Sequence, residues 1–229
     1  GDLRSFYEGS LLGLFTPFTV IWGLLSVAML VLHGAAFLTT KTGPGPVQDR
    51  ARRFGAVAAP LAITLFAIGG AYVAFGNMGY ALASPVDPMG PSNPVRETTV
   101  VAAGAWLANY GRYPWMMIAP ILGFAGAALG WIGIVRRHEA IAFAGSSLSA
   151  LGIISTVGLS MFPFILPSSI DPHSSLTVWN ASSSERTLFI MLVVTVVLLP
   201  IVLAYTAWAF KVMWGRVTPE QIKTSPDFY

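Results

Sequence analysis

The sequence predicts an all-α, polytopic membrane protein with about five transmembrane helices. Only 10% of its 229 residues are charged and 55% are hydrophobic, whereas a soluble domain carries about 25% charged residues. The apolar residues also lie in long runs, without the short alternation that marks half-buried strands. We therefore expect one transmembrane helical domain over residues 1–229.

Each predicted helix is an apolar stretch that is long enough to cross a bilayer. The hydrocarbon core is about 30 Å thick, and a helix needs about 20 residues to span it. In chain order the predicted spans cover residues 11–38, 54–75, 114–135, 140–164 and 188–210. The first of these is a full-length span rather than a signal peptide, and we expect the natural protein to begin upstream of Gly1.

The segments between the spans carry their own signals. Residues 42–53 begin with a Gly-Pro-Gly-Pro run, which cannot continue a helix, and end with three arginines, so we assign them to a loop. The connection after the third span is a tight turn. A long loop, residues 167–184, precedes the fifth span, where Ser182 and Glu185 have the spacing of a capping box.

Lysine and arginine are distributed unevenly between the two sets of helix ends. Nine lie on one side: Lys41, Arg50, Arg52, Arg53, Arg136, Arg137, Lys211, Arg216 and Lys223. Four lie on the other: Arg4, Arg96, Arg112 and Arg186. The positive-inside rule predicts that the basic loops and the C-terminus face the cytoplasm. The net charge of +3 fits such anchoring, and no basic run with interleaved aromatics indicates nucleic-acid binding.

The predicted membrane interior offers little acid–base or metal chemistry. All ten acidic residues fall in loops or at helix ends, and the chain has no cysteine. Of the three histidines, only His33 lies within a span. We interpret it as a histidine near a helix end bonded to a backbone carbonyl, with a proton-carrying or ligand role as the alternative.

Small residues dominate the third and fourth spans instead. Gly126 and Gly130 have the spacing of a close-packing pair, and the fourth span is rich in serine. Such residues let helix backbones approach closely. A serine-lined water path is the sharper alternative for the fourth span.

Several segments resemble subunit II of cytochrome bd-type ubiquinol oxidases. The most specific are MFPFILPSS at residues 161–169 and SLTVWNASS at residues 175–183. The resemblance continues through PIVLAYTAW at 200–208 and MWGRVT at 213–218, and includes HGAAFL at 33–38 and GAWLAN at 104–109. It covers the whole chain but corresponds only to the carboxy-terminal part of that subunit, and it implies a four-helix bundle plus one further helix.

The resemblance implies a heterodimer in a bacterial cytoplasmic (inner) membrane. Subunit I would carry the b- and d-type haems, oxidise quinol and reduce oxygen to water, generating a proton-motive force. This chain would be a haem-free, non-catalytic subunit of that quinol:oxygen oxidoreductase, an electrogenic translocase. Small single-span accessory subunits, membrane lipid, the quinol pool and a bound quinone or phospholipid are further expected partners.

The resemblance assigns no catalytic, cofactor-binding or metal-binding residue to this chain. Contacts with subunit I, lipid or quinone are expected of six residues: Trp106, Asn109, Trp179, Asn180, Ser182 and Ser183. The alternative roles are helix capping and loop docking, and for Trp106 anchoring at the membrane surface. Two other functions fit a packed bundle: half of a secondary transporter, and a structural membrane assembly protein.

Overall fold

A computed structural model describes residues 9–76, 78–86, 90, 97–212 and 214–216. The described chain forms two compact units, one containing residues 9–81 and 100–162 and the other residues 82–99 and 163–216. Three of the basic residues used to predict orientation, Arg4, Arg96 and Lys223, lie outside the described residues. The expectation of a single domain stays a prediction.

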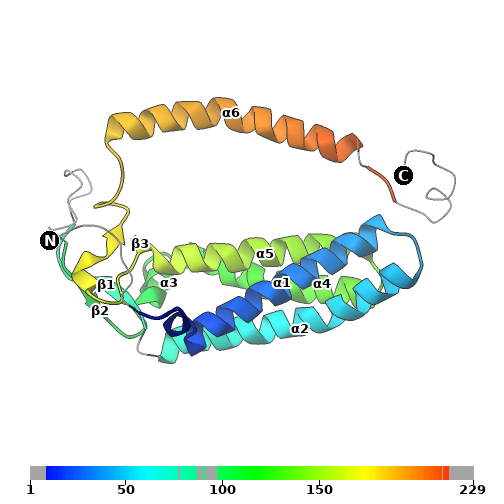
Figure 1. Ribbon diagram of the computed structural model, residues 1–229, viewed down its shortest axis with the longest axis horizontal. Helices are drawn as coiled ribbons and strands as arrows, with labels where there is room; N and C mark the ends of the chain where they lie inside the picture. Colours follow the sequence, from blue (N-terminus) through cyan, green and yellow to red (C-terminus); the bar gives the residue numbers. More distant parts are fainter. Residues whose placement is uncertain (1–8, 77, 87–89, 91–96, 213, 217–229) are drawn as a thin grey trace. The chain divides into compact units, whose positions relative to one another are not determined.

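The first unit is a bundle of four long helices, which lie side by side in Figure 1. They are α1 (Pro17–Lys41), α2 (Pro46–Phe75), α4 (Ile118–Val135) and α5 (Glu139–Met161). Shorter elements complete the unit: η1 (Leu11–Leu14), η3 (Ala105–Leu107), α3 (Ala108–Arg112) and η4 (Pro114–Met117). A two-stranded ribbon of β1 (Tyr80–Leu82) and β2 (Thr99–Val101) marks the boundary between the units.

Two predicted boundaries of the first hairpin are wrong. Helix α1 begins at Pro17 rather than near residue 11, because Thr16 caps it by accepting a hydrogen bond from the Thr19 N–H. Helix α2 begins at Pro46, so the arginines assigned to a loop lie on its first turns. Proline is favourable at a first helical position, so the Gly-Pro-Gly-Pro run ends one helix and also starts the next.

Glycines bring α4 and α5 into backbone contact. A Cβ atom added to Gly126 would meet the backbone of Ser149, and one added to Gly152 would meet the backbone of Gly123. The same holds for Gly133 and Gly145, which face the backbones of Ala142 and Gly130. The predicted close packing at Gly126 is therefore confirmed. We call this contact the glycine seam: Gly123, Gly126, Gly130 and Gly133 of α4 with Gly145 and Gly152 of α5.

Larger side chains fill the rest of the bundle core. One cluster includes Leu32, Ala59 and Ile134, and a second includes Leu25, Phe66 and Ile153. Both clusters combine residues from α1, α2 and the α4–α5 hairpin. The core is thus shared by all four helices.

The second unit contains a small ribbon and a long helix. Strand β3 (Phe164–Leu166) pairs antiparallel with β4 (Leu176–Thr177), with η5 (Pro172–Ser174) between them. The fourth span therefore ends at Met161, before the predicted limit of 164. Helix α6 (Glu185–Val212) begins at Glu185, and the Leu188 N–H donates to the Ser184 carbonyl. The first intrahelical bond therefore ends at Ser184, two residues later than the predicted cap at Ser182, and the capping box of Ser182 and Glu185 stays a prediction.

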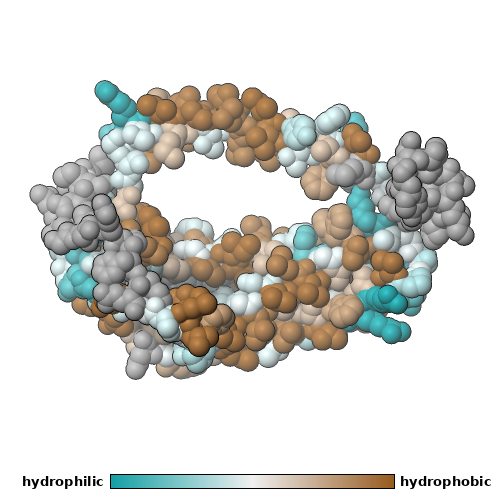
Figure 2. All heavy atoms as spheres, viewed as in Figure 1, coloured by the Kyte–Doolittle hydropathy of each residue, from teal (hydrophilic) through white to brown (hydrophobic). Residues whose placement is uncertain are grey.

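Among the residues that the structure describes, five helices are long and apolar enough to cross a membrane: residues 17–41, 46–75, 114–135, 139–161 and 185–212. Figure 2 shows hydrophobic side chains along the helices and hydrophilic ones gathered near helix ends. The prediction of an all-α, polytopic membrane protein is confirmed.

Candidate functional site

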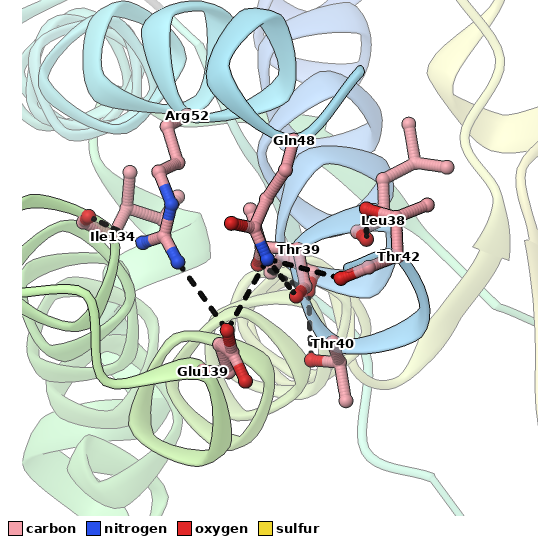
Figure 3. Close-up of polar contacts among 9 residues, drawn as sticks. Leu38, Thr39, Thr40, Thr42, Gln48, Arg52, Ile134 and Glu139 are labelled. Atoms are coloured by element: carbon pink, nitrogen blue, oxygen red, sulfur yellow. Dashed lines mark hydrogen bonds and ion pairs between the residues drawn. The ribbon is translucent and has the colours of Figure 1, made fainter. Parts of the chain in front are cut away.

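Polar side chains meet where α1 and α4 end and where α2 and α5 begin. Gln48 and Arg52 lie one turn apart on α2, and Glu139 is the first residue of α5. Figure 3 shows both α2 side chains directed toward the Glu139 carboxylate. We call this cluster the polar joint: Gln48, Arg52 and Glu139, with the backbone carbonyls of Thr39, Thr42 and Ile134 that they contact.

Gln48 connects the joint to the end of α1. Its Nε2 atom lies 3.0 Å from the Thr39 oxygen, 3.0 Å from the Thr42 oxygen and 3.3 Å from Oε1 of Glu139. Carbonyls near a helix C-terminus lack intrahelical donors, so a side-chain amide here satisfies groups that the helix itself leaves open. Only 6% of Gln48 is exposed.

Arg52 joins α2 to the α4–α5 hairpin. Its Nη1 donates to the Ile134 carbonyl at 3.2 Å, and its Nη2 lies 3.4 Å from Oε1 of Glu139. The two side chains are 12% and 18% exposed, so this ion pair is screened by water less than a surface pair. Glu139 also stands in the first turn of α5, where the helix dipole favours a negative charge.

The α4–α5 turn positions Glu139 through a Schellman motif. The His138 N–H donates to the Gly133 carbonyl at 2.8 Å and the Arg137 N–H to the Ile134 carbonyl at 3.3 Å. Arg137 takes a positive φ of 59°, a conformation that glycine usually supplies at this position. The Ile134 carbonyl therefore accepts from a backbone donor and from Arg52.

His33 lies within α1 and bonds to α5. Its Nδ1 is 3.0 Å from Oγ of Ser146, which in turn lies 2.9 Å from the Phe143 carbonyl. The Ser146 hydroxyl thus bridges the imidazole and a carbonyl of its own helix, and the donor in the His33 contact depends on the imidazole tautomer. The expected bond to a backbone carbonyl is wrong, since the partner is a side chain on another helix.

The serine hydroxyls of α5 bond mainly to protein carbonyls. Ser149 donates across the glycine seam to the Gly123 carbonyl at 3.2 Å, and Ser147 donates to the Phe143 carbonyl at 2.9 Å. Ser160 shares a 2.7 Å hydrogen bond with the Tyr110 hydroxyl. These contacts favour packing over the serine-lined water path.

Two of the predicted contact residues, Trp106 and Asn109, lie at the other end of the bundle. Trp106 is 9% exposed, so its ring packs inside the protein, and its anchoring at the membrane surface stays a prediction. Asn109 donates from Nδ2 to the carbonyls of Leu159 and Phe162 at 2.9 and 2.6 Å. It thereby caps the end of α5.

The other four predicted contact residues lie in the second unit, near a carboxylate. Asn180 is buried; its side chain accepts from the Thr177 N–H at 2.7 Å and donates to Oε2 of Glu97 at 2.9 Å. The Thr177 hydroxyl donates to the same oxygen at 2.8 Å. Trp179 and Ser182 are partly buried and Ser183 is exposed. Asn180 thus organises its own loop, and contacts of these residues with a partner, lipid or quinone stay predictions.

Metal chemistry finds little support in the part of the chain that the structure describes. No group of three or more His, Cys, Asp and Glu side chains there is arranged to hold a metal ion. The polar joint pairs each of its donors with an acceptor. Its arrangement is that of a structural junction between four helix ends.

Sequence reasoning missed the joint and the Glu97 cluster. The signal for the joint is the spacing of Gln48 and Arg52, which places both on one face of a helix. That signal was hidden because residues 42–53 were assigned to a loop. Glu97 carries no comparable signal, since its partners lie 80 and 83 residues away.

Comparison with known proteins gives a consistent family. The model of the family described as cytochrome bd terminal oxidase subunit II matches residues 2–213. The cytochrome bd-I ubiquinol oxidase subunit 2 of Escherichia coli K12 is 40% identical over 221 residues, which cover 96% of this chain and 58% of that protein.

Two further relatives agree with it. The probable cytochrome oxidase subunit 2 of Haemophilus influenzae is 37% identical over 92% of this chain and 55% of its own length. The cytochrome bd ubiquinol oxidase subunit 2 of Bacillus subtilis is 34% identical over 80 residues, or 34% of this chain and 24% of its own length. The chain spans just over half the length of the first two relatives.

Proposed function

The chain belongs to the cytochrome bd terminal oxidase subunit II family, and from this premise we propose that it serves as the haem-free subunit of a quinol-oxidising terminal oxidase. A haem-bearing subunit I is its partner, and that partner oxidises quinol and reduces oxygen to water. The observation that carries the proposal is the family match over residues 2–213. The role of this chain is then to support the partner in the membrane rather than to perform the redox chemistry.

The architecture of the bundle supports a scaffolding role. The glycine seam and the polar joint are packing devices, and His33 is engaged by Ser146 within the bundle. In this proposal the b- and d-type haems belong to the partner. Membrane lipid, a bound quinone and small single-span subunits are further partners of the complex.

The experiment that tests this function is a visible absorption spectrum of the chain purified with its native partners in mild detergent. We expect b- and d-type haem bands in the oxidised and reduced complex, and their loss from this chain when the copurifying subunit is stripped away. A colourless complex without a second membrane subunit would overturn the proposal. Substrate uptake by this chain alone would favour a transporter, and a stable cofactor-free complex would favour a structural assembly protein.

The proposed location is a bacterial inner membrane, with the basic turns and the C-terminus in the cytoplasm. Because the chain has no cysteine, a single introduced thiol shows on which side of the membrane its position lies. We expect a membrane-impermeant maleimide to label Asp171→Cys in spheroplasts, where the outer face of the inner membrane is accessible. Arg53→Cys should react only after permeabilisation, and the reverse pattern would invert the topology.

A further inference from the structure

Five aromatic side chains cluster at the end of the bundle opposite the polar joint. Phe18 lies at the centre, with its ring centroid 5.8 Å from that of Trp22, 5.6 Å from that of Tyr72 and 6.3 Å from that of Trp106. Tyr80 lies 6.0 Å from Trp106. We call these five residues the aromatic cap.

Two buried donors in the cap have no acceptor. The Nε1 atoms of Trp22 and Trp106 are both buried, and no acceptor lies within hydrogen-bond distance of either among the described residues. An indole N–H can only donate, and a buried donor without a partner is costly. Trp106 is more than nine-tenths buried. Two such donors on rings that both contact Phe18 indicate an acceptor that is not among the described residues.

The two rings are held in place by their neighbours. Trp22 packs over Gly69, where an added Cβ would lie 3.2 Å from the indole, and its ring meets Phe66 edge-on at 6.4 Å. Trp106 lies between Phe18 and Tyr80. Neither indole can turn outward without losing these contacts, so the donors are fixed before any ligand arrives.

The chemistry of the cap selects a neutral ligand. No lysine, arginine or histidine belongs to it, and an anion among aromatic rings would lose its hydration without gaining a counter-charge. A neutral oxygen acceptor would accept from the indoles at much lower cost. The cap also lies at the start of α1 and the end of α2, where a spanning helix pair meets the membrane surface.

We propose that the aromatic cap binds a neutral molecule that supplies the missing acceptor oxygen to the buried indole N–H groups of Trp22 and Trp106. The oxygen comes either from an ordered water molecule or from the ester carbonyl of a membrane phospholipid. The proposal does not depend on the oxidase role, because it rests only on groups within this bundle.

The test removes the N–H and keeps the ring. β-(3-Benzothienyl)alanine is introduced at position 22 or 106 of the full protein, purified with its partners, and thermal unfolding is followed together with phospholipid content by mass spectrometry. We expect each replacement to lower the midpoint by about 2 to 4 °C. The same replacement at Trp131, which is 41% exposed on α4, is the control and should change nothing.

The results distinguish a water oxygen from a phospholipid oxygen, and both from a cap that binds neither. If the oxygen belongs to a phospholipid, the replacements reduce bound lipid, and delipidation abolishes the difference from the native protein until phospholipid is added back. If it belongs to water, the difference survives delipidation. An unchanged or raised midpoint at both positions would overturn the proposal, because removing a donor that has no partner costs nothing. Trp106→Phe and Trp22→Phe serve as second variants, with bound lipid as their readout.

Discussion

The four-helix bundle is held together in two contrasting ways, by the glycine seam along α4 and α5 and by the polar joint at the helix ends. The seam works because side chains are missing: two backbones touch, and a Cβ added at Gly126, Gly133, Gly145 or Gly152 would overlap the facing backbone. The joint works because long polar side chains of one helix bond to backbone carbonyls at the ends of its neighbours. The seam therefore depends on shape, and a side chain added at any of these four positions disrupts it. The joint depends on polar and charged groups, so a substitution of similar size can weaken it without destroying it.

The largest effect is expected from breaking the seam. Gly152→Ala puts a methyl group against the backbone of Gly123. Because a backbone cannot move aside easily, we expect the free energy of unfolding to fall by about 3 kcal/mol or more. Thermal unfolding in detergent measures it. The matched control is Gly158→Ala on the same helix, where an added Cβ has nothing within 4 Å. Equal behaviour of the two variants would refute the seam.

A smaller loss is expected from opening the joint. Arg52→Ala removes the donor to the Ile134 carbonyl and leaves the Glu139 carboxylate with less compensation. Because both side chains keep some exposure, we expect about 1 to 3 kcal/mol rather than the larger cost of a fully buried pair. Arg53→Ala removes an exposed arginine from the neighbouring position and should stay within about 0.5 kcal/mol. A comparable loss in both variants would contradict the assigned role of Arg52.

The charge itself is tested by Glu139→Gln. The amide keeps an oxygen for the Gln48 donor but loses the attraction to Arg52, so we expect a loss of about 0.5 to 1.5 kcal/mol. A double-mutant cycle with Arg52→Gln measures the coupling directly. The coupling should shrink in 1 M salt, where the screening length is about 3 Å. A coupling that is absent at low salt would show that the pair contributes through packing only.

The smallest expected effect is an increase in stability. Arg137 takes a positive φ that costs a side-chain-bearing residue about 1 kcal/mol, so Arg137→Gly should stabilise the hairpin by about 0.5 to 1 kcal/mol. Arg136 has a φ of −83°, so Arg136→Gly serves as the control and should destabilise slightly. Chemical denaturation in mixed micelles compares the two. A gain for both variants would point to charge removal rather than backbone strain.

The sequence was a good guide to the bundle and a poor one to its contacts. Helix length, apolar runs and the Gly126–Gly130 spacing follow from local chemistry, and the structure confirms them. The interaction partners could not be predicted in this way, because the sequence around Arg52 carries no information about a carboxylate 87 residues away. The aromatic character of Trp106 suggested the membrane surface, but tertiary packing with Phe18 and Tyr80 buries the ring.

The arrangement of the joint has a consequence for the order of biosynthesis. Gln48 finds its two carbonyl partners within the first hairpin, so the turn between α1 and α2 closes as soon as that hairpin leaves the translocon. Arg52 must wait, because Ile134 and Glu139 are synthesised more than 80 residues later. During that interval we expect its charge to favour keeping the turn on the aqueous side of the bilayer. The joint can close only after the α4–α5 hairpin has been synthesised, so the closed joint marks assembly of the four-helix bundle, ahead of α6.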